Sequence, residues 1–263
     1  MHNNMVSDAC LVVDIGNTNI SCGIYQNEEL AWFARLSSSL DRTADEYYSF
    51  LKPLLDGFHE EKIGFIALAS VVPGLTRVWQ HLFRKYFNLT AWELSALNVP
   101  ELKYRVADPS FIGADLIANA YGAWKKYGSS CLILDLGTAT KVQLVTAEGS
   151  FEGAAIAPGL KTGAGQLFQS AALLAPIELS KPEVLLGTST KDALLSGIVR
   201  GHSYMLQSYV RQVKLHYFEL KDLQVILTGG IAELVKPLVP AAEILDKFLT
   251  LDGIFLAWKH SHA

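Results

Sequence analysis

Two copies of one short pattern, half a chain length apart, constrain the fold more than any other feature of this sequence. The segments D-I-G-N-T at 14–18 and D-L-G-T-A-T at 135–140 each follow an apolar run and precede a second β-like run. This order predicts a strand, a tight turn and a second strand, over residues 11–25 and again over 131–146. Asp14 and Asp135 lie 121 residues apart. A single repeat at that spacing indicates two related halves, because solenoid repeats recur every ~20–50 residues.

Strands and helices alternate in the rest of the chain, which is typical of an α/β architecture. Residues 43–56 predict a helix that begins with a capping box of Thr43 and Glu46 and ends or bends at Pro53. Apolar residues at helical spacing predict a second helix over 114–126. We place the boundary between the halves near residues 115–130, which gives domains 1–120 and 121–263. Further strands are expected at 63–72, 151–157 and 223–228, and further helices at 74–87, 162–174, 189–217 and after Gly230.

Composition excludes several classes of protein. Of the 263 residues, 50% are hydrophobic and 18% are charged, which excludes a disordered chain, a collagen and a coiled coil. The net charge of −4 argues against a nucleic-acid binder with a basic face. No apolar stretch approaches the ~18–20 residues that span a bilayer, and the first ten residues lack the features of a signal peptide. Cys10, Cys22 and Cys131 lack metal-ligand spacing, so we expect reduced thiols and a cytoplasmic protein.

The two predicted turns carry residues that suit phosphate binding. Asp14 and Asp135 end apolar strands, where a carboxylate is costly to bury unless it is paired, hydrogen-bonded or bound to a cation. Gly16 and Gly137 allow close backbone approach, and the short polar side chains within 17–21 can donate hydrogen bonds to phosphate oxygens. A simpler hypothesis is that Asp, Gly and Asn only suit the turn conformation. Two copies in two similar halves favour phosphate binding.

Two further segments are candidates for function. Gly229 and Gly230 follow the strand predicted to end at Thr228, a position that permits close approach of a nucleotide base or ribose. Asp115 lies in the first turn of the helix predicted at 114–126. An acid there is either a catalytic base or a residue that the helix dipole stabilises by roughly 0.3–1 kcal/mol. His202 is expected to be a surface or packing histidine.

Together these segments resemble the actin-like, or sugar-kinase-like, ATP-binding superfamily, and within it the type III pantothenate kinases, also called the Bvg accessory factor family. The resemblance covers about residues 10–258. It implies an α/β fold of two duplicated actin-like (ribonuclease H-like) domains with an ATP cleft between them. The matching motifs occur in one order: DIGNT at 14–18, SVVP at 70–73, IGADLIANA at 112–120, DLGTAT at 135–140, FEGAAIAPGL at 151–160, LGTST at 186–190, SGIVRG at 196–201 and LTGG at 227–230.

The resemblance also implies an activity and roles for individual residues. The activity is ATP-dependent phosphorylation of pantothenate to 4'-phosphopantothenate, the first step of coenzyme A biosynthesis. It implies a homodimer, and the composition adds the expectation that there is no nucleic-acid or membrane partner. Asp115 matches the catalytic base, and Asp135 matches the ligand of a potassium or ammonium ion that acts beside ATP and Mg²⁺. The positions that match ATP-binding residues are Asp14, Ile15, Gly16, Asn17, Thr18, Asn19, Ile20, Ser21, Thr138, Gly229 and Gly230, and those that match substrate-binding residues are Gly113, Ala114, Asp115, Leu116, Thr190 and Tyr104.

The chain departs from the family pattern on the substrate side. Leu116 stands where the family has an arginine, and leucine cannot donate a hydrogen bond to pantothenate. Val106 stands where the family has a tyrosine, for which Tyr104 is a nearby substitute, and Gln143 stands where the family often has an aspartate. Two alternatives therefore stay open beside the pantothenate kinase. One is a catalytically weak nucleotide-binding homologue with a regulatory role, and the other is a kinase for another small hydroxy acid.

Overall fold

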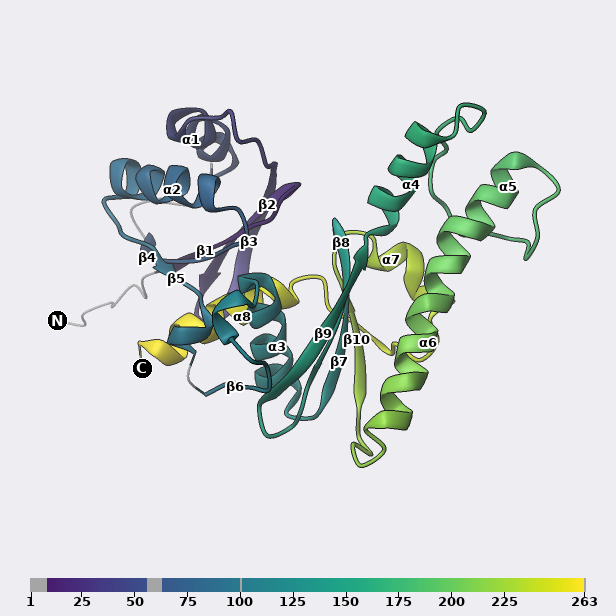
Figure 1. Cartoon of the computed structure of the whole chain (residues 1–263). Coiled ribbons are helices and arrows are strands. Elements are labelled where there is room, and N and C mark those ends of the chain that lie inside the picture. The colour runs from purple at the N-terminus through teal and green to yellow at the C-terminus, as the bar shows by residue number, and fades with distance from the viewer. Residues whose placement is uncertain (1–8, 56–62, 100, 263) are drawn as a thin grey trace. The chain divides into compact units, whose positions relative to one another are not determined.

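The computed structural model describes residues 9–55, 63–99 and 101–262 (Figure 1). Residue contacts divide the chain into two compact units. The first unit comprises the described residues up to Leu102, the segment Ala107–Gly122 and the described residues from Thr250 onward. The second unit comprises Lys103–Val106 and Ala123–Leu249. Residues 1–8, on which the expectation about a signal peptide depends, and residue 56, the expected end of a helix, lie outside the described residues.

The first unit is built on a mixed sheet. Its strands are β1 (Ala9–Ile15), β2 (Asn19–Gln26), β3 (Glu29–Ser37), β4 (Ile63–Ser70) and β5 (Trp92–Glu93). They lie in the order β3-β2-β1-β4-β5. β1, β2 and β3 are antiparallel neighbours, whereas β4 runs parallel to β1 and β5 runs parallel to β4. The hairpin of β1 and β2 is the one that the sequence predicts over 11–25.

The second unit repeats this arrangement. Its strands are β6 (Lys103–Tyr104), β7 (Cys131–Leu136), β8 (Ala139–Val145), β9 (Ser150–Pro158), β10 (Gln224–Thr228) and β11 (Ile244–Leu245), in the order β11-β10-β7-β8-β9-β6. β7, β8 and β9 are antiparallel neighbours, and β10 and β11 continue the sheet in parallel. Apart from β6, the order and directions match those of the first sheet. The predicted duplication of a mixed α/β unit is therefore confirmed.

Two helices cover one face of the first sheet. α1 (Ala44–Leu54) begins with the predicted capping box, in which the backbone N–H of Thr43 donates to the Glu46 carboxylate at 2.8 Å. α2 (Pro73–Leu82) begins with a proline, whose fixed φ suits the first helical turn. The buried rings of Tyr47 and Trp79 lie 5.4 Å apart between centroids. They pack with the alternate apolar side chains Leu11, Val13 and Ile15 of β1 in one core.

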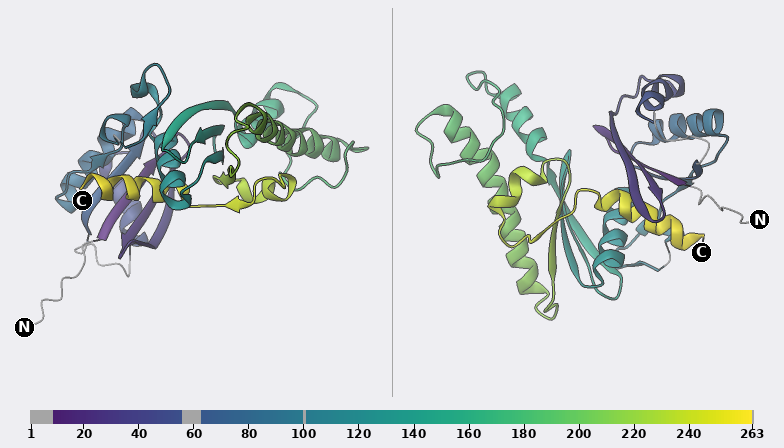
Figure 2. Two further views of the ribbon diagram at one scale, coloured as in Figure 1. Left: turned by 90° about the horizontal axis from the view of Figure 1, so that it is seen from below. Right: turned by 180° about the vertical axis from the view of Figure 1, so that it is seen from behind.

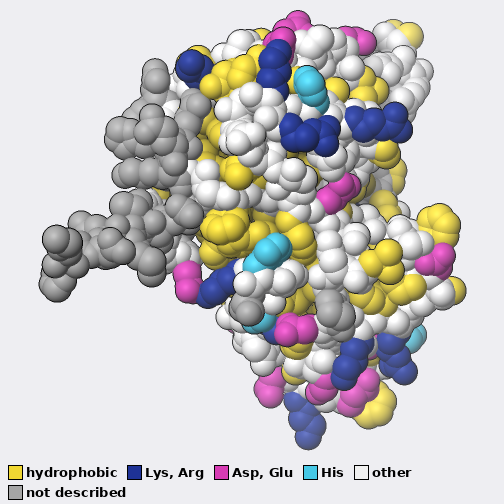
Figure 3. All heavy atoms as spheres, turned by 90° about the vertical axis from the view of Figure 1, so that its left-hand side faces the viewer, with side chains coloured by type: hydrophobic (Ala, Val, Ile, Leu, Met, Phe, Trp, Pro, Cys, Tyr) yellow, Lys and Arg dark blue, Asp and Glu magenta, His cyan; other side chains and the backbone are white. Residues whose placement is uncertain are grey.

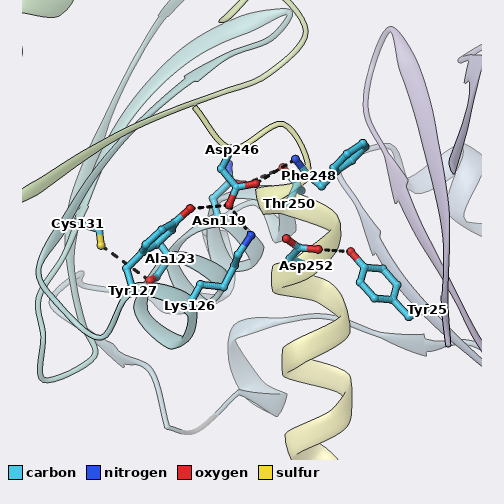
Figure 4. A network of polar contacts seen from close by, with 10 residues as sticks. All are labelled: Tyr25, Asn119, Ala123, Lys126, Tyr127, Cys131, Asp246, Phe248, Thr250 and Asp252. Carbon is cyan, nitrogen blue, oxygen red and sulfur yellow. Dashed lines mark hydrogen bonds and ion pairs between the residues drawn. The ribbon is translucent and has the colours of Figure 1, made fainter. Parts of the chain in front are cut away.

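Helix α8 (Leu249–Ser261) lies on the other side of that sheet, as Figures 1 and 2 show. The ring of Tyr25 on β2 stacks on Phe255 with centroids 4.3 Å apart, and its hydroxyl donates to Asp252 (Figure 4). A Cβ on Gly253 would lie 1.9 Å from the carbonyl oxygen of Ala118 on α3 (Ala114–Tyr127). α8 therefore belongs to the first unit, whereas the expected domains place the C-terminal residues in the second.

The helices of the second unit are α4 (Leu160–Ser170), α5 (Thr190–Leu195), α6 (Gly201–His216) and α7 (Ala232–Val235). Leu132, Leu134 and Leu136, which alternate along β7, share a core with residues of α6 such as Leu206 and Val210. The intervening β7 residues, which include Asp135, therefore point to the opposite face of the sheet. This alternation decides which side chains can meet Asp135.

Several element boundaries differ from the expected ones. The helix expected at 74–87 ends in a π-helical turn at Phe83–Phe87. The helix expected at 189–217 is interrupted by a π-helical turn at Ser196–Arg200. α4 ends at Ser170, four residues earlier than expected. Strand β3 and helix α8 were not predicted. The short strands β5, β6 and β11 were also not predicted, because two-residue strands leave no periodicity in a sequence. Among the described helices, none is long and apolar enough to cross a membrane.

Candidate functional site

The turn of the first hairpin is fixed by its own backbone and by one residue that follows β3. The N–H of Gly16 donates to the carbonyl of Asn19 at 3.0 Å. Ser38 holds the turn at two points, because its backbone N–H donates to the Thr18 carbonyl at 3.0 Å and its hydroxyl donates to the Gly16 carbonyl at 2.5 Å. Asn17, Thr18 and Asn19 are exposed on this turn. These residues are therefore accessible to a ligand.

Asp14 lies beside this turn at the carboxyl end of β1. It is half-buried and pairs across the hairpin with Ser21, while Ile15 and Ile20, its neighbours in the predicted ATP segment, are buried. β4 ends next to β1, where the N–H of Val71 donates to the Ile15 carbonyl at 3.1 Å. The carboxyl ends of parallel strands are the usual place for ligands in open α/β sheets. The first hairpin therefore has the location expected of a binding site.

The predicted catalytic segment meets the same edge of the first unit. The Gly113 carbonyl accepts the first helical hydrogen bond of α3, from Ile117 N at 3.2 Å. Asp115 is half-buried in the first turn, and its Oδ1 accepts a hydrogen bond from the Leu116 N–H at 2.8 Å. A Cβ on Gly113 would lie 3.5 Å from Cγ1 of Val71. Val71 therefore connects the end of β1 to the predicted substrate segment.

The second hairpin has an equivalent turn. The N–H of Gly137 donates to the Ala139 carbonyl at 3.1 Å, and the N–H of Gly159, directly after β9, donates to the Thr138 carbonyl at 3.0 Å. Gly159 thus makes the backbone bond that Ser38 makes in the first unit. The hydroxyl of Thr162 on α4 also donates to the Thr138 carbonyl, at 2.8 Å. Gly137 and Thr138 are exposed, as a phosphate contact requires.

Asp135 is buried below this turn and is paired. Its Oδ2 lies 2.7 Å from Nζ of Lys141, and the two side chains are 9% and 13% exposed, respectively. Lys141 lies directly opposite Asp135 in the β7–β8 register. The sequence analysis predicted a metal ligand at Asp135 and did not consider Lys141. Gln143, two residues further along β8 on the same face, is 1% exposed.

The glycine pair after β10 lines a pocket. Gly229 has φ +94°, and a Cβ there would lie 2.6 Å from the Leu136 carbonyl oxygen, so no other residue fits without strain. Gly230 is one wall of a cavity of about 490 Å³ within the second unit, a size typical of small-ligand sites. The other lining residues are Lys161, Ala164, Gly165, Phe168, Ile177, Glu178, Leu179, Ile231, Glu233 and Leu234. A pocket with both apolar and charged lining residues beside a glycine pair suits a nucleotide.

The remaining predicted substrate residues lie in separate places. Leu116 is buried, with 7% exposure, and Ala114 is buried beside it. Thr190 is exposed at the start of α5. The Tyr104 hydroxyl on β6 is buried with no hydrogen-bond partner among the described residues, and burial raises the pKa of this phenol to about 12. Val106 lies in the segment after β6.

The structure groups the predicted residues by unit. Residues 14–21 and 113–116 belong to the first unit, and Tyr104, Asp135, Thr138, Thr190, Gly229 and Gly230 belong to the second. Sequence analysis missed Ser38, Val71, Thr162 and Phe168. Ser38 and Thr162 bond to turn carbonyls from outside the hairpins and Val71 acts through its backbone N–H and packing, so no local pattern marks them. Lys141 had a signal, since a lysine six residues after a strand-end aspartate lies opposite it in a tight hairpin.

Comparisons with known proteins agree with this fold and these motifs. Residues 10–212 match the family model described as type III pantothenate kinase. A type III pantothenate kinase of Roseiflexus castenholzii is 37% identical over 251 residues, covering 95% of this chain and 98% of that protein. The corresponding protein of Halalkalibacterium halodurans is 34% identical, with the same coverage.

Solved structures show the same fold at lower identity. A conserved Baf family protein of Campylobacter jejuni gives a TM-score of 0.62 at 19% identity, covering 96% of this chain and 98% of that one. A ROK family glucokinase of Streptomyces griseus, crystallised with glucose and AMPPNP, gives 0.56 at 13% identity, covering 95% and 99%. The fold is therefore that of the actin-like ATPases and sugar kinases. Taken with the family model and the relatives at 34–37% identity, it establishes that this chain belongs to the type III pantothenate kinase family.

Proposed function

We propose that this chain transfers the γ-phosphate of ATP to the primary hydroxyl of pantothenate and forms 4'-phosphopantothenate, the first step of coenzyme A biosynthesis. The observation that carries the proposal is the pair of equivalent turns, Gly16–Asn19 and Gly137–Ala139, each with exposed polar groups at the end of a buried strand. They occur in a chain whose relatives, named type III pantothenate kinase, match over 95% of its length.

Each predicted residue has a distinct task in this reaction. The exposed backbone and side chains of residues 16–19, and Thr138 in the second turn, donate hydrogen bonds to phosphate oxygens. The pocket beside Gly230 takes the base. Asp115 accepts the proton of the substrate hydroxyl as the bond to phosphorus forms. The hydrogen bond from Leu116 N at 2.8 Å orients the Asp115 carboxylate in the first turn of α3.

Magnesium fits this arrangement as a partner of the nucleotide. Mg²⁺ is usually held by one or two carboxylates together with substrate phosphates and water. No cluster of three or more His, Cys, Asp or Glu occurs among the described residues, which agrees with an ion that arrives bound to ATP. Asp14, half-buried at the first turn, is the carboxylate that we assign to the Mg-ATP complex. When bound, the ion neutralises charge on the β- and γ-phosphates.

The monovalent cation that the resemblance implies does not fit in the same way. It would bind at Asp135, whose carboxylate already carries the Lys141 ammonium at 2.7 Å. No step of the proposed reaction uses a potassium or ammonium ion.

We also propose that the enzyme works in the cytoplasm as a homodimer. The three cysteines are free and buried, which suits a reducing compartment. A dimer is supported by large apolar side chains that are exposed in the second unit, because contact with a second copy would remove them from water. They include Leu167, Leu173, Val184, Leu185 and Leu186. Basic and acidic side chains are interspersed on the face in Figure 3, which suits a small-molecule enzyme better than a nucleic-acid or membrane binder.

A coupled assay of ADP release tests the proposal, with pantothenate, other small hydroxy acids and no acceptor compared side by side. We expect turnover with pantothenate only. Asp115→Asn should lower kcat by about 10²–10⁴-fold, the contribution of a general base, while nucleotide binding persists. Asp14→Ala should abolish transfer. Turnover with another acid would support the alternative kinase. Nucleotide binding without any turnover would support the regulatory homologue.

A further inference from the structure

The ion pair between Asp135 and Lys141 has a consequence for the cation requirement of this enzyme. We propose that the Lys141 ammonium acts as a tethered monovalent cation, so that the second phosphate-binding hairpin needs neither potassium nor ammonium ions. The effect of Lys141 on turnover rests on the proposed kinase function. The effect of Lys141 on cation binding does not depend on that function.

The pair lies at the base of the phosphate-binding turn. Nζ of Lys141 is 2.7 Å from Oδ2 of Asp135, and Oδ1 lies 3.8 Å from the position that a Cβ on Gly137 would occupy. The carboxylate is thus flanked by the turn on one side and by the ammonium on the other. Both side chains are largely buried, with 9% of Asp135 and 13% of Lys141 exposed. A buried pair of this kind is screened little by salt.

The duplicated hairpin provides an internal comparison. In the first unit, Asp14 occupies the position that Asp135 has in the second, and the residue opposite it is Ser21. In the second unit, the residue opposite the aspartate is Lys141. A lysine is therefore not required to form such a hairpin. Its presence beside one aspartate and not the other points to a role that is local to the second turn.

The Asp135 carboxylate already has a cationic partner within the chain. On this face of the sheet Asp135 contributes one negative charge and Lys141 one positive charge, while buried Gln143 is a neutral amide. A potassium ion that bound to Asp135 would lie close to a like charge, and like charges repel. A lysine ammonium is a compact point charge on a flexible stem, so it can supply the same charge from within the chain.

The experiment compares wild type, Lys141→Met and Lys214→Met in potassium, ammonium, sodium and tetramethylammonium chlorides, at an equal ionic strength of about 0.1 M. Lys214 is exposed on α6 and serves as the matched control for loss of one positive charge. Turnover of pantothenate is measured, together with the midpoint of thermal unfolding without substrate. Binding of thallium(I), a potassium substitute, is followed by its NMR signal.

We expect wild type and Lys214→Met to respond equally, within about twofold, to all four salts. Lys141→Met should lose turnover by about 10–100-fold in tetramethylammonium, the loss expected for one interaction with a charged group, and regain it in potassium or ammonium. It should also gain thermal stability in potassium and bind thallium(I). Asp135→Asn/Lys141→Met, which lacks both charges, should show no potassium response.

Strong activation of wild type by potassium would overturn the proposal. A Lys141→Met protein whose turnover, stability and thallium(I) binding respond to no cation would also overturn it, since Lys141 would then be only a structural partner of Asp135. If Lys141→Met folds solely in potassium, the proposal is supported. If it folds in no salt, Lys141→Gln replaces it, and the wild-type salt series still decides. An absence of turnover in every salt would contradict the kinase function alone, because unfolding and thallium binding still report on the cation.

Discussion

Gly113→Ala is expected to lower catalysis while leaving the fold intact. A Cβ on Gly113 would lie 2.7 Å from Oδ1 of Asp115, whereas the next contact, with Val71, would be an ordinary 3.5 Å. The first contact is too short to persist, and the group that it meets is the end of a side chain. The Asp115 carboxylate should therefore rotate away while the backbone of α3 stays in place.

The size of the effect follows from this displacement. Relief of the contact moves the carboxylate by roughly 0.5–0.7 Å, and a misplacement of 1 Å at a reacting group can cost about 100-fold. We therefore expect kcat to fall by about 10–30-fold. Alanine is also a poorer residue than glycine before the first helical turn, which should cost about 1 kcal/mol, or roughly 2–4 °C in Tm.

The assay is steady-state turnover at saturating ATP and pantothenate, with Tm measured on the same preparations. Gly201→Ala is the control, because a Cβ on this exposed helical glycine meets no atom within 4 Å and alanine favours helices. Unchanged kcat in Gly113→Ala would refute the assignment of Asp115 as the base. A fall in Tm far beyond the expected range would show that the backbone, and not the side chain, gives way.

Three further predictions concern the same units. Leu116→Arg should lower the free energy of unfolding by about 3–5 kcal/mol, because Leu116 is only 7% exposed and an arginine there would bury an unpaired guanidinium. An unchanged Tm together with a lower KM for pantothenate would contradict this prediction. Burial lowers the pKa of His202, whose Nε2 lies 2.9 Å from Thr140 Oγ1. The unfolded chain therefore binds more protons, and the stability that neutral His202 provides is complete above its unfolded pKa of 6.5 and is lost as the pH falls. Tm should drop less between about pH 7.5 and pH 5.5 in His202→Gln than in wild type, and equal drops would refute this assignment. Gly229→Ala should cost about 2–5 kcal/mol in chemical denaturation, from its positive φ and the clash with Leu136, and an unshifted midpoint would argue against that backbone geometry.

Local patterns in the sequence were enough to predict the repeated hairpins and most of the helices. Apolar runs that end in Asp-x-Gly predicted β1–β2 and β7–β8, and Thr43 with Glu46 predicted the start of α1. These features depend on a few adjacent residues, whose turn and capping preferences do not need the rest of the chain. The order of motifs also pointed to the family that the comparisons establish.

Only the tertiary structure decided which distant residues meet. Glycine disfavours helices, so Gly253 concealed α8, whose close approach to Ala118 requires that glycine. The strand register placed Lys141 opposite Asp135, so the residue predicted as a metal ligand lies in an ion pair. Gly113 looked like part of a motif, but its contact with the Asp115 carboxylate exists only once α3 has formed. Packing between segments far apart in sequence decides only the contact of Gly253 with Ala118, whereas the other two contacts depend on the strand register and the helical turn that form when the chain folds.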